Sequence, residues 1–354
     1  MKFSKSLLAL CAIAALAPLA TAQKGATPVD LGTLGGSSSY ATAINSGDIT
    51  VGAGNVFSDA VQHGFYTNSL GYIQDIGSLI GVYGNSAATG VSTQGVVVGT
   101  SDQIIDTSGD IATHAFYYQS SRTGLQDVGT NGGTLSYASA IQNAIVVGYA
   151  TVADDVAYCA FYWTKTKGMT NLSTLAADSC NDGYNSYAYG MNSKGVAVGS
   201  SDSTDGTTHA AAWNLKTKVI YDLGTLGGSL AQLNAVNSSN MMVGFSSLPG
   251  DSQIDATANT GLTLVDIGNL GGSYAASTAV NDSGTVVGFS NITGDTDVHA
   301  FVWTQGGGMV DLNTLLPAGS AFTELSAANG IAADGTIVGV GISAIDGQPH
   351  AFAW

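Results

Sequence analysis

Histidines are the residues of this 354-residue chain best suited to acid–base or metal chemistry, because imidazole titrates near neutral pH and binds metal ions. All five begin the same repeated stretch, best seen in His299-Ala300-Phe301-Val302-Trp303, and they are His63, His114, His209, His299 and His350. A catalytic or metal site needs its side chains to converge, whereas repeats hold equivalent residues apart. We therefore interpret the histidines as structural and predict no metal site.

An Asp-aliphatic-Gly mark also recurs, and its aspartate is expected to accept N–H groups of its own turn. A hydrogen bond between the repeated histidine and this aspartate is an open alternative. One repeat favours this bond, because Cys159 replaces its histidine and Asn171 replaces its aspartate, so the two residues are lost together. It is opposed where Asp255 takes the histidine position while Asp266 is retained.

The elements that position these residues follow a period of about 45 residues. The mark and its degenerate copies give seven repeat starts, near residues 30, 75, 127, 171, 222, 266 and 311. Within a repeat, alternating segments and Gly-containing turns predict four short strands and no helix. This pattern predicts an all-β fold, a single seven-bladed β-propeller with four-stranded blades over residues 23–354. A parallel β-helix is the alternative, but its coils would be about half this length.

The two ends of the repeat array complement each other. The chain stops at Trp354, after the third strand of the last repeat, and Val29-Asp30-Leu31-Gly32 is a fourth strand with no repeat before it. We expect this N-terminal strand to complete the last blade and close the ring, which would hide two sheet edges. The four tryptophans should pack between blades as further structural repeat residues: Trp163, Trp213, Trp303 and Trp354.

Residues 1–22 read as a signal peptide, with two lysines, an apolar run and a small-residue cleavage site ending at Ala22. The mature chain is thus expected outside the cytoplasm, secreted or periplasmic. A lipoprotein anchored through Cys11 is a weaker alternative, and no later stretch has the ~20 apolar residues that span a bilayer. In an exported protein the two remaining cysteines, Cys159 and Cys180, predict a disulfide.

Charge is scarce and one-sided. After cleavage, 7 Lys and Arg face 25 Asp and Glu, a formal charge of −18. Nucleic acid and anionic lipid are held by clustered cations, so neither is an expected partner.

The loops between second and third strands vary in sequence but scarcely in length, and they hold 13 of the 24 aspartates. We expect them on one face of the propeller, with interblade loops beside them. The candidates for this binding face are Asp102, Asp106, Asp110, Asp154, Asp155, Asp202, Asp205, Asp295, Asp297, Tyr184 and Tyr187. Two other interpretations stay open: these aspartates serve solubility and turn formation, or they form a Ca²⁺-binding rim, although no loop completes an EF-hand pattern. No other cofactor is expected.

Three motifs recur along the mature chain: Asp-Leu-Gly-x-Leu-Gly-Gly, Ala-x-x-x-Asn-x-x-Gly-x-x-Val-Gly and His-Ala-Phe-x-Trp. Together they resemble the HAF-repeat family of bacterial extracellular repeat proteins. The resemblance implies secretion and a repeat fold, and it supplies no catalytic residues. Similar repeats in exported parts of bacterial surface proteins imply adhesion or binding by analogy.

Enzyme motifs are scarce. The chain has one glutamate, Glu324, and one arginine, Arg122, and it contains neither a Gly-x-Ser-x-Gly elbow nor a phosphate-binding loop. We predict a secreted, monomeric, non-enzymatic binding module with an extracellular glycan or protein ligand. The alternative is a carbohydrate-active hydrolase or lyase that uses aspartates of the same face.

Overall fold

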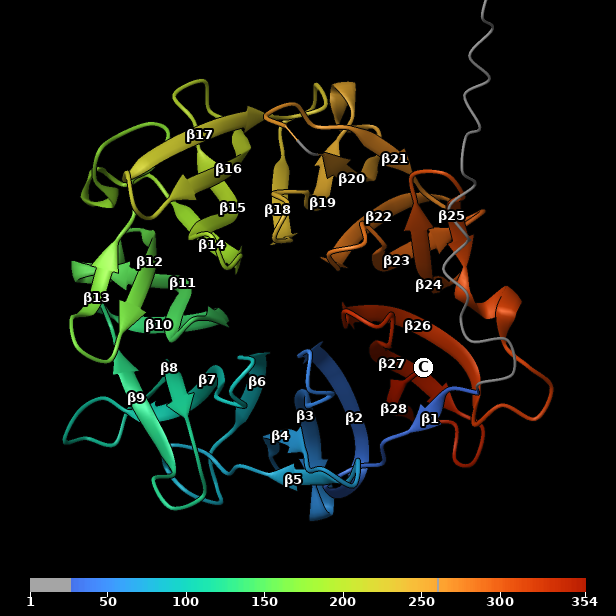
Figure 1. The fold of residues 1–354 in the computed structure, drawn as a ribbon. Coiled ribbons are helices and arrows are strands. Elements are labelled where there is room, and N and C mark those ends of the chain that lie inside the picture. The colour runs from blue at the N-terminus through green and yellow to red at the C-terminus, as the bar shows by residue number, and fades with distance from the viewer. Residues whose placement is uncertain (1–26, 260) are drawn as a thin grey trace, which may run out of the picture.

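The computed structural model describes residues 27–259 and 261–354, so the predicted signal peptide lies outside the described residues. The fold is an all-β propeller whose four-stranded sheets surround a central opening (Figure 1). Short 3-10 turns supply the only helical residues of the described chain. Among these residues, no helix has the length and apolarity to cross a membrane.

The first two blades are sequential antiparallel sheets, with the first strand of each nearest the opening. Their strands are β2 (Gly35–Ile44), β3 (Thr50–Val56), β4 (Gln62–Thr67) and β5 (Ile73–Asp75), then β6 (Ser86–Val91), β7 (Val97–Ile104), β8 (Ile111–Tyr118) and β9 (Leu125–Gly129). The next two follow the same order: β10 (Gly132–Gln142), β11 (Ile145–Val152), β12 (Tyr158–Thr164) and β13 (Gly168–Asn171), then β14 (Ser186–Met191), β15 (Val196–Asp202), β16 (Thr208–Asn214) and β17 (Val219–Gly224).

Two further blades are joined by one parallel pairing, between Ile254 and Tyr274. They contain β18 (Ala231–Val236), β19 (Met242–Ser247), β20 (Ile254–Asn259) and β21 (Asp266–Gly268), then β22 (Gly271–Val280), β23 (Val286–Ile292), β24 (Val298–Thr304) and β25 (Gly308–Asp311). The 3-10 turns are η1 (Phe57–Asp59), η2 (Ala153–Asp155), η3 (Cys180–Asp182), η4 (Pro249–Asp251) and η5 (Leu312–Leu315).

The terminal blade combines both ends of the described chain. It contains β26 (Phe322–Ile331), β27 (Ile337–Ser343), β28 (Pro349–Ala353) and, as its fourth strand, β1 (Val29–Asp30). In the antiparallel β1–β28 ladder, Val29 lies opposite Ala353 and Asp30 opposite Phe352. The amide of Asn329 in the terminal blade also donates to the carbonyl of Ala41 in the first blade, 2.8 Å away.

The repeated Val-Gly glycine is required by a bulge in the neighbouring strand. Every first strand shifts its register at this place, as between Ala41 and Ala43 opposite Gly52. A Cβ on Gly52 would collide with the carbonyl oxygen of Tyr40. The second strand can pass this close only without a side chain.

Facing blades bury the hydrophobic core between them. The phenylalanine two residues after the repeated histidine position is fully buried wherever it occurs: Phe65, Phe116, Phe161, Phe301 and Phe352. Between the third and fourth blades, Val147 and Ala160 pack in one cluster with Trp213. The indole N–H of Trp213 donates to the carbonyl of Ser173 at 2.9 Å. Trp163, Trp303 and Trp354 pack against similar clusters.

Candidate functional site

The antiparallel order of each blade gives the ring two distinct faces. Connections from first to second strand and from third to fourth strand emerge on one side, which we call the turn face. Connections from second to third strand and the links between blades emerge on the other side, which we call the loop face.

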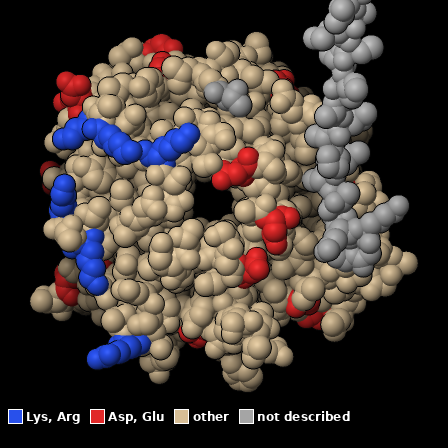
Figure 2. Space-filling view, in the orientation of Figure 1, with Lys and Arg blue, Asp and Glu red and all other residues tan. Residues whose placement is uncertain are grey.

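The described cations all belong to the turn face. They are Arg122, Lys165, Lys167, Lys194, Lys216 and Lys218, each in a turn of the second, third or fourth blade. Figure 2 shows this face, with Lys and Arg over one side of the ring and acidic side chains near the central opening. The loop face therefore carries no lysine or arginine within the described ranges.

The five histidines lie on the loop face, and each is held by an aspartate at the end of the fourth strand. The distances from histidine Nδ1 to the carboxylate are 2.7–3.0 Å, and the pairs are His63–Asp75, His114–Asp127, His209–Asp222, His299–Asp311 and His350–Asp30. Each aspartate also accepts the backbone N–H two residues later. We call this arrangement the His–Asp clamp.

In one clamp the bonds to the aspartate change its ionisation. Burial favours the neutral form of Asp127, but the hydrogen bonds from His114 and from the Gly129 N–H outweigh it and lower the Asp127 pKa. Because the clamps stand in separate blades, the histidines do not converge on one site.

Two blades lack the clamp histidine. In the third blade, Cys159 at the histidine position forms a disulfide with Cys180 in η3, and their Cα atoms are 5.5 Å apart. The predicted disulfide is thus confirmed. In the fifth blade, Asp255 lies beside Asp266, and burial together with the Asp255 charge raises the Asp266 pKa. Asp255 is 4% exposed and accepts hydrogen bonds from the amides of Gln253 and Asn269.

Several predicted binding-face aspartates hold the interblade loops. Asp155 and Asp295 accept the N–H groups of Thr134 and Ser273 at 2.7–2.8 Å, just after a Gly-Gly pair. Asp59 does the same in the first blade, where a Cβ on Gly36 would lie 2.5 Å from the Asp59 carboxylate. The last glycine of the Asp-Leu-Gly-x-Leu-Gly-Gly motif therefore makes room for this aspartate.

Asp102 and Asp202 use a different loop partner. Each accepts both the backbone and side-chain N–H groups of one asparagine, Asn85 or Asn185, at 2.8–2.9 Å. The other predicted residues lie apart on the same face. Asp106 accepts N–H groups of its own turn, including that of Asp110. Asp205 accepts the backbone N–H of Thr207. Asp154 lies in η2.

The predicted tyrosines lie at the junction of the third and fourth blades. Tyr184 is partly exposed in the interblade loop, while Tyr187 belongs to a cluster with Tyr137, Tyr149, Tyr158 and Tyr189. Burial and the neighbouring tyrosines raise the pKa of Tyr149 to about 12. This cluster joins the two blades through ring contacts of 4.8–6.3 Å.

Apolar loop tips are a feature that the sequence analysis missed. Among the exposed large hydrophobic residues described, Phe57 at 83% and Tyr83 and Ile345 at 86% have the highest exposed fractions. All three lie on the loop face, in the first blade, the link after it and the terminal blade. Since these blades are neighbours, the three residues belong to one sector of the ring, which we call the apolar sector.

Glu324 is a further residue that the sequence analysis did not assign to a site. It lies at the start of β26 on the loop face, beside Asp297 and His299 of the preceding blade. Glu324 is the single glutamate of the sequence, which could have drawn attention to it. Its neighbours in space, however, depend on how the two blades pack.

Comparison with known proteins gives fold likeness only. No protein family and no curated protein matches the sequence. Among solved structures, a TolB from Agrobacterium tumefaciens is 12% identical with a TM-score of 0.48, over 79% of this chain and 92% of that one. TolB from Acinetobacter baumannii is 10% identical with a TM-score of 0.46, over 84% and 66%. A lectin from Aleuria aurantia is 14% identical with a TM-score of 0.36, over 80% and 97%. We draw no functional argument from likenesses this distant.

Proposed function

We propose that this protein is a secreted, non-enzymatic β-propeller that acts as an extracellular binding module through its loop face. The observation that carries the proposal is the apolar sector, where Phe57, Tyr83 and Ile345 stand more than four-fifths exposed. Large apolar side chains this exposed on neighbouring loops offer apolar surface for a contact with a partner. The surrounding acidic loops add negative charge to that face.

The proposed architecture is a seven-bladed ring closed by β1. The β1–β28 ladder and the Asn329–Ala41 hydrogen bond support closure, because both join the beginning of the chain to its end. We also propose that the chain is a monomer of the HAF-repeat family, exported by a signal peptide that is cleaved after Ala22. The Cys159–Cys180 disulfide supports an oxidising compartment outside the cytoplasm, secreted or periplasmic.

The ligand that best fits the loop face is a protein surface with apolar and basic groups. Phe57 and Ile345 offer no hydrogen-bonding group to a sugar, whereas they suit apolar pockets on a protein. We include no Ca²⁺ ion in the acidic loops, because Asp102, Asp155 and Asp202 already accept hydrogen bonds that hold those loops.

The carbohydrate-active alternative needs two carboxylates facing a sugar across a gap of about 5–10 Å. The closely paired carboxyls Asp255 and Asp266 do not provide this arrangement. Their side chains interact directly with each other, and Asp255 is only 4% exposed.

The test is a binding experiment on arrays of purified matrix proteins and glycans. The loop-face variant carries Phe57→Ser, Tyr83→Ser and Ile345→Ser. The matched turn-face variant carries Leu70→Ser and Tyr72→Ser, because these residues are 77% and 67% exposed on the opposite side. We expect binding to a protein target that falls about tenfold or more in the loop-face variant and persists in the turn-face variant. Equal loss in both variants, or cleavage of an arrayed glycan, would contradict the proposal.

A further inference from the structure

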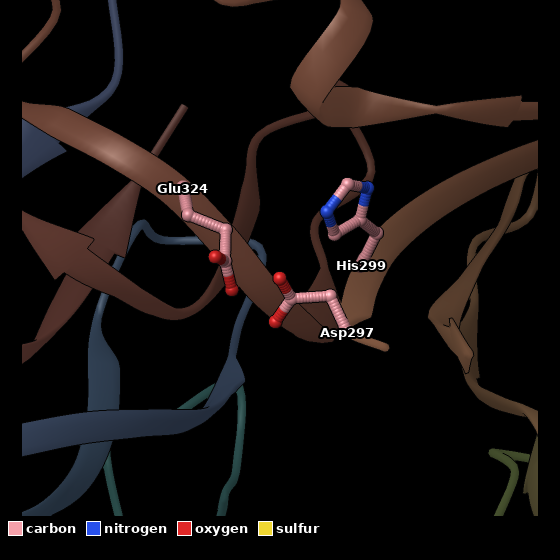
Figure 3. Close-up of side chains that lie close together, drawn as sticks. All are labelled: Asp297, His299 and Glu324. Atoms are coloured by element: carbon pink, nitrogen blue, oxygen red, sulfur yellow. The ribbon is translucent and has the colours of Figure 1, made fainter. Parts of the chain in front are cut away.

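We propose that Asp297, His299 and Glu324 form a divalent metal site, suited to Zn²⁺, between the β22–β25 blade and the terminal blade. Each residue offers one ligand atom, and these atoms all lie within 4.8 Å of one another. Figure 3 shows the carboxylates of Asp297 and Glu324 turned toward each other, with one ring nitrogen of His299 facing them. This inference is independent of the proposed protein-binding function.

The histidine is already oriented as a metal ligand. Its Nδ1 lies 2.7 Å from the Asp311 carboxylate, so in the neutral ring the proton sits on Nδ1 and is donated to Asp311. The Nε2 lone pair is then free to bind a cation. A carboxylate on the far nitrogen is the usual partner of a metal-binding histidine, because it fixes the ring and increases its basicity.

The local charge also favours a cation. Two carboxylates face each other, and no ion pair within the described ranges joins either of them to a lysine or arginine. Glu324 Oε1 accepts a hydrogen bond from the Ser326 hydroxyl, which orients the carboxylate without neutralising it. A bound divalent ion would balance the two negative charges.

The third ligand distinguishes this junction from related ones. His209 and His350 also have a nearby loop aspartate, with Nε2 at 3.5 Å from Asp205 and 3.4 Å from Asp346. Within the described ranges, only the group containing Glu324 brings three ligand atoms together. The corresponding residues Asn85 and Asn185 at the start of β6 and β14 instead accept backbone N–H groups from the preceding blade.

The composition of the site indicates the class of ion. One imidazole and two carboxylates match the nitrogen and oxygen ligands of Zn²⁺, which binds at about 2.0–2.2 Å and leaves a fourth tetrahedral position for water or another ligand. Ca²⁺ requires about six to eight oxygen ligands. Asp297 is exposed and the His299 side chain is 18% exposed, so an ion can reach the site from solvent. Once bound, it would link two neighbouring blades.

The test uses the purified protein without a histidine tag, stripped with a chelator and dialysed. Calorimetric titration with Zn²⁺ should give one ion per chain, and Co²⁺ should give the strong visible absorption of a tetrahedral site. Glu324→Gln and Asp297→Asn should each weaken binding by about tenfold or more, while near-ultraviolet circular dichroism of the metal-free proteins stays unchanged.

The matched control is Asp205→Asn, which alters the two-residue arrangement around His209 and should leave Zn²⁺ affinity unchanged. The proposal would be overturned by no binding at millimolar Zn²⁺, or by unchanged affinity in both Glu324→Gln and Asp297→Asn. An equal loss in Asp205→Asn would also overturn it, because binding would then not depend on the third ligand. If Glu324→Gln fails to fold, Asp297→Asn still tests the metal site, because Asp297 is exposed.

Discussion

The third and fifth blades occupy equivalent places in the propeller and lack the same histidine, yet they replace the His–Asp clamp with opposite chemistry. In the third blade, Cys159 is joined covalently to Cys180. In the fifth blade, Asp255 faces Asp266, and the Asp266 pKa rises because of burial and the Asp255 charge. The disulfide joins the third strand covalently to the following interblade loop. In the fifth blade, the two carboxyl groups at the equivalent place repel each other.

This difference shows which part of the repeat is required. In the fifth blade, the backbone N–H of Gly268 still donates to the Asp266 carboxylate at 2.7 Å. The blades with a His–Asp clamp have the same bond, for example from Gly129 to Asp127. The aspartate therefore bonds the turn even where no histidine faces it, whereas the residue at the histidine position varies from blade to blade. The third blade, which has lost both residues, has the disulfide instead.

The largest expected effect is loss of this disulfide. The bridge spans 21 residues, and its removal should lower the free energy of unfolding by about 2–4 kcal/mol. The double variant Cys159→Ser/Cys180→Ser should show this loss in urea denaturation and should not respond to reductant, unlike the wild type. A thiol assay on the denatured, unreduced mature protein should find no free cysteine; one equivalent or more per chain would contradict the bridge.

The next effect concerns a clamp that keeps its histidine. His63 is 2% exposed and donates to Asp75, so His63→Gln should destabilise the protein by about 1–3 kcal/mol through a lost or misaligned buried hydrogen bond. His209→Gln is the matched comparison, because the His209 side chain is 15% exposed and water can replace part of its bond. Equal urea midpoints for wild type and His63→Gln would show that the clamp adds no stability.

The sequence predicted the propeller of four-stranded sheets and the disulfide because their signals are local or repeated. Alternating strands, turn glycines and two cysteines in an exported chain need no knowledge of packing. The seven-blade count, ring closure and signal peptide remain predictions.

The individual sites were harder to predict because they depend on contacts across blades. Asp155 was predicted as a residue of the binding face, yet its carboxylate accepts the N–H of Thr134, 21 residues away. The meeting of Glu324 with His299 likewise depends on how neighbouring blades pack. The sequence analysis took Asp255 and the retained Asp266 as an argument against a His–Asp bond, yet this bond forms in every blade that has the histidine. The sequence also could not reveal that the two carboxyls would lie together.

The smallest expected effect tests that carboxyl pair. A raised Asp266 pKa contributes stability that is fully present below the unfolded-state pKa and is lost as pH rises through the folded-state value. Asp255→Asn removes the opposing charge, so it should stabilise the protein relative to wild type at pH 7. Because Asp266 is exposed and solvent screens its charge, we expect a gain of only about 0.5 kcal/mol.

Paired urea titrations at several pH values measure this difference. The advantage of Asp255→Asn over wild type should shrink below about pH 4, where Asp266 becomes protonated in both folded and unfolded chains. Asp255→His, which restores the clamp residue, should also stabilise the protein at pH 7 by giving Asp266 a donor. An advantage of Asp255→Asn that stays constant from acidic to neutral pH would mean that the two carboxyls do not interact electrostatically, and the fifth blade would then differ from its neighbours in packing alone.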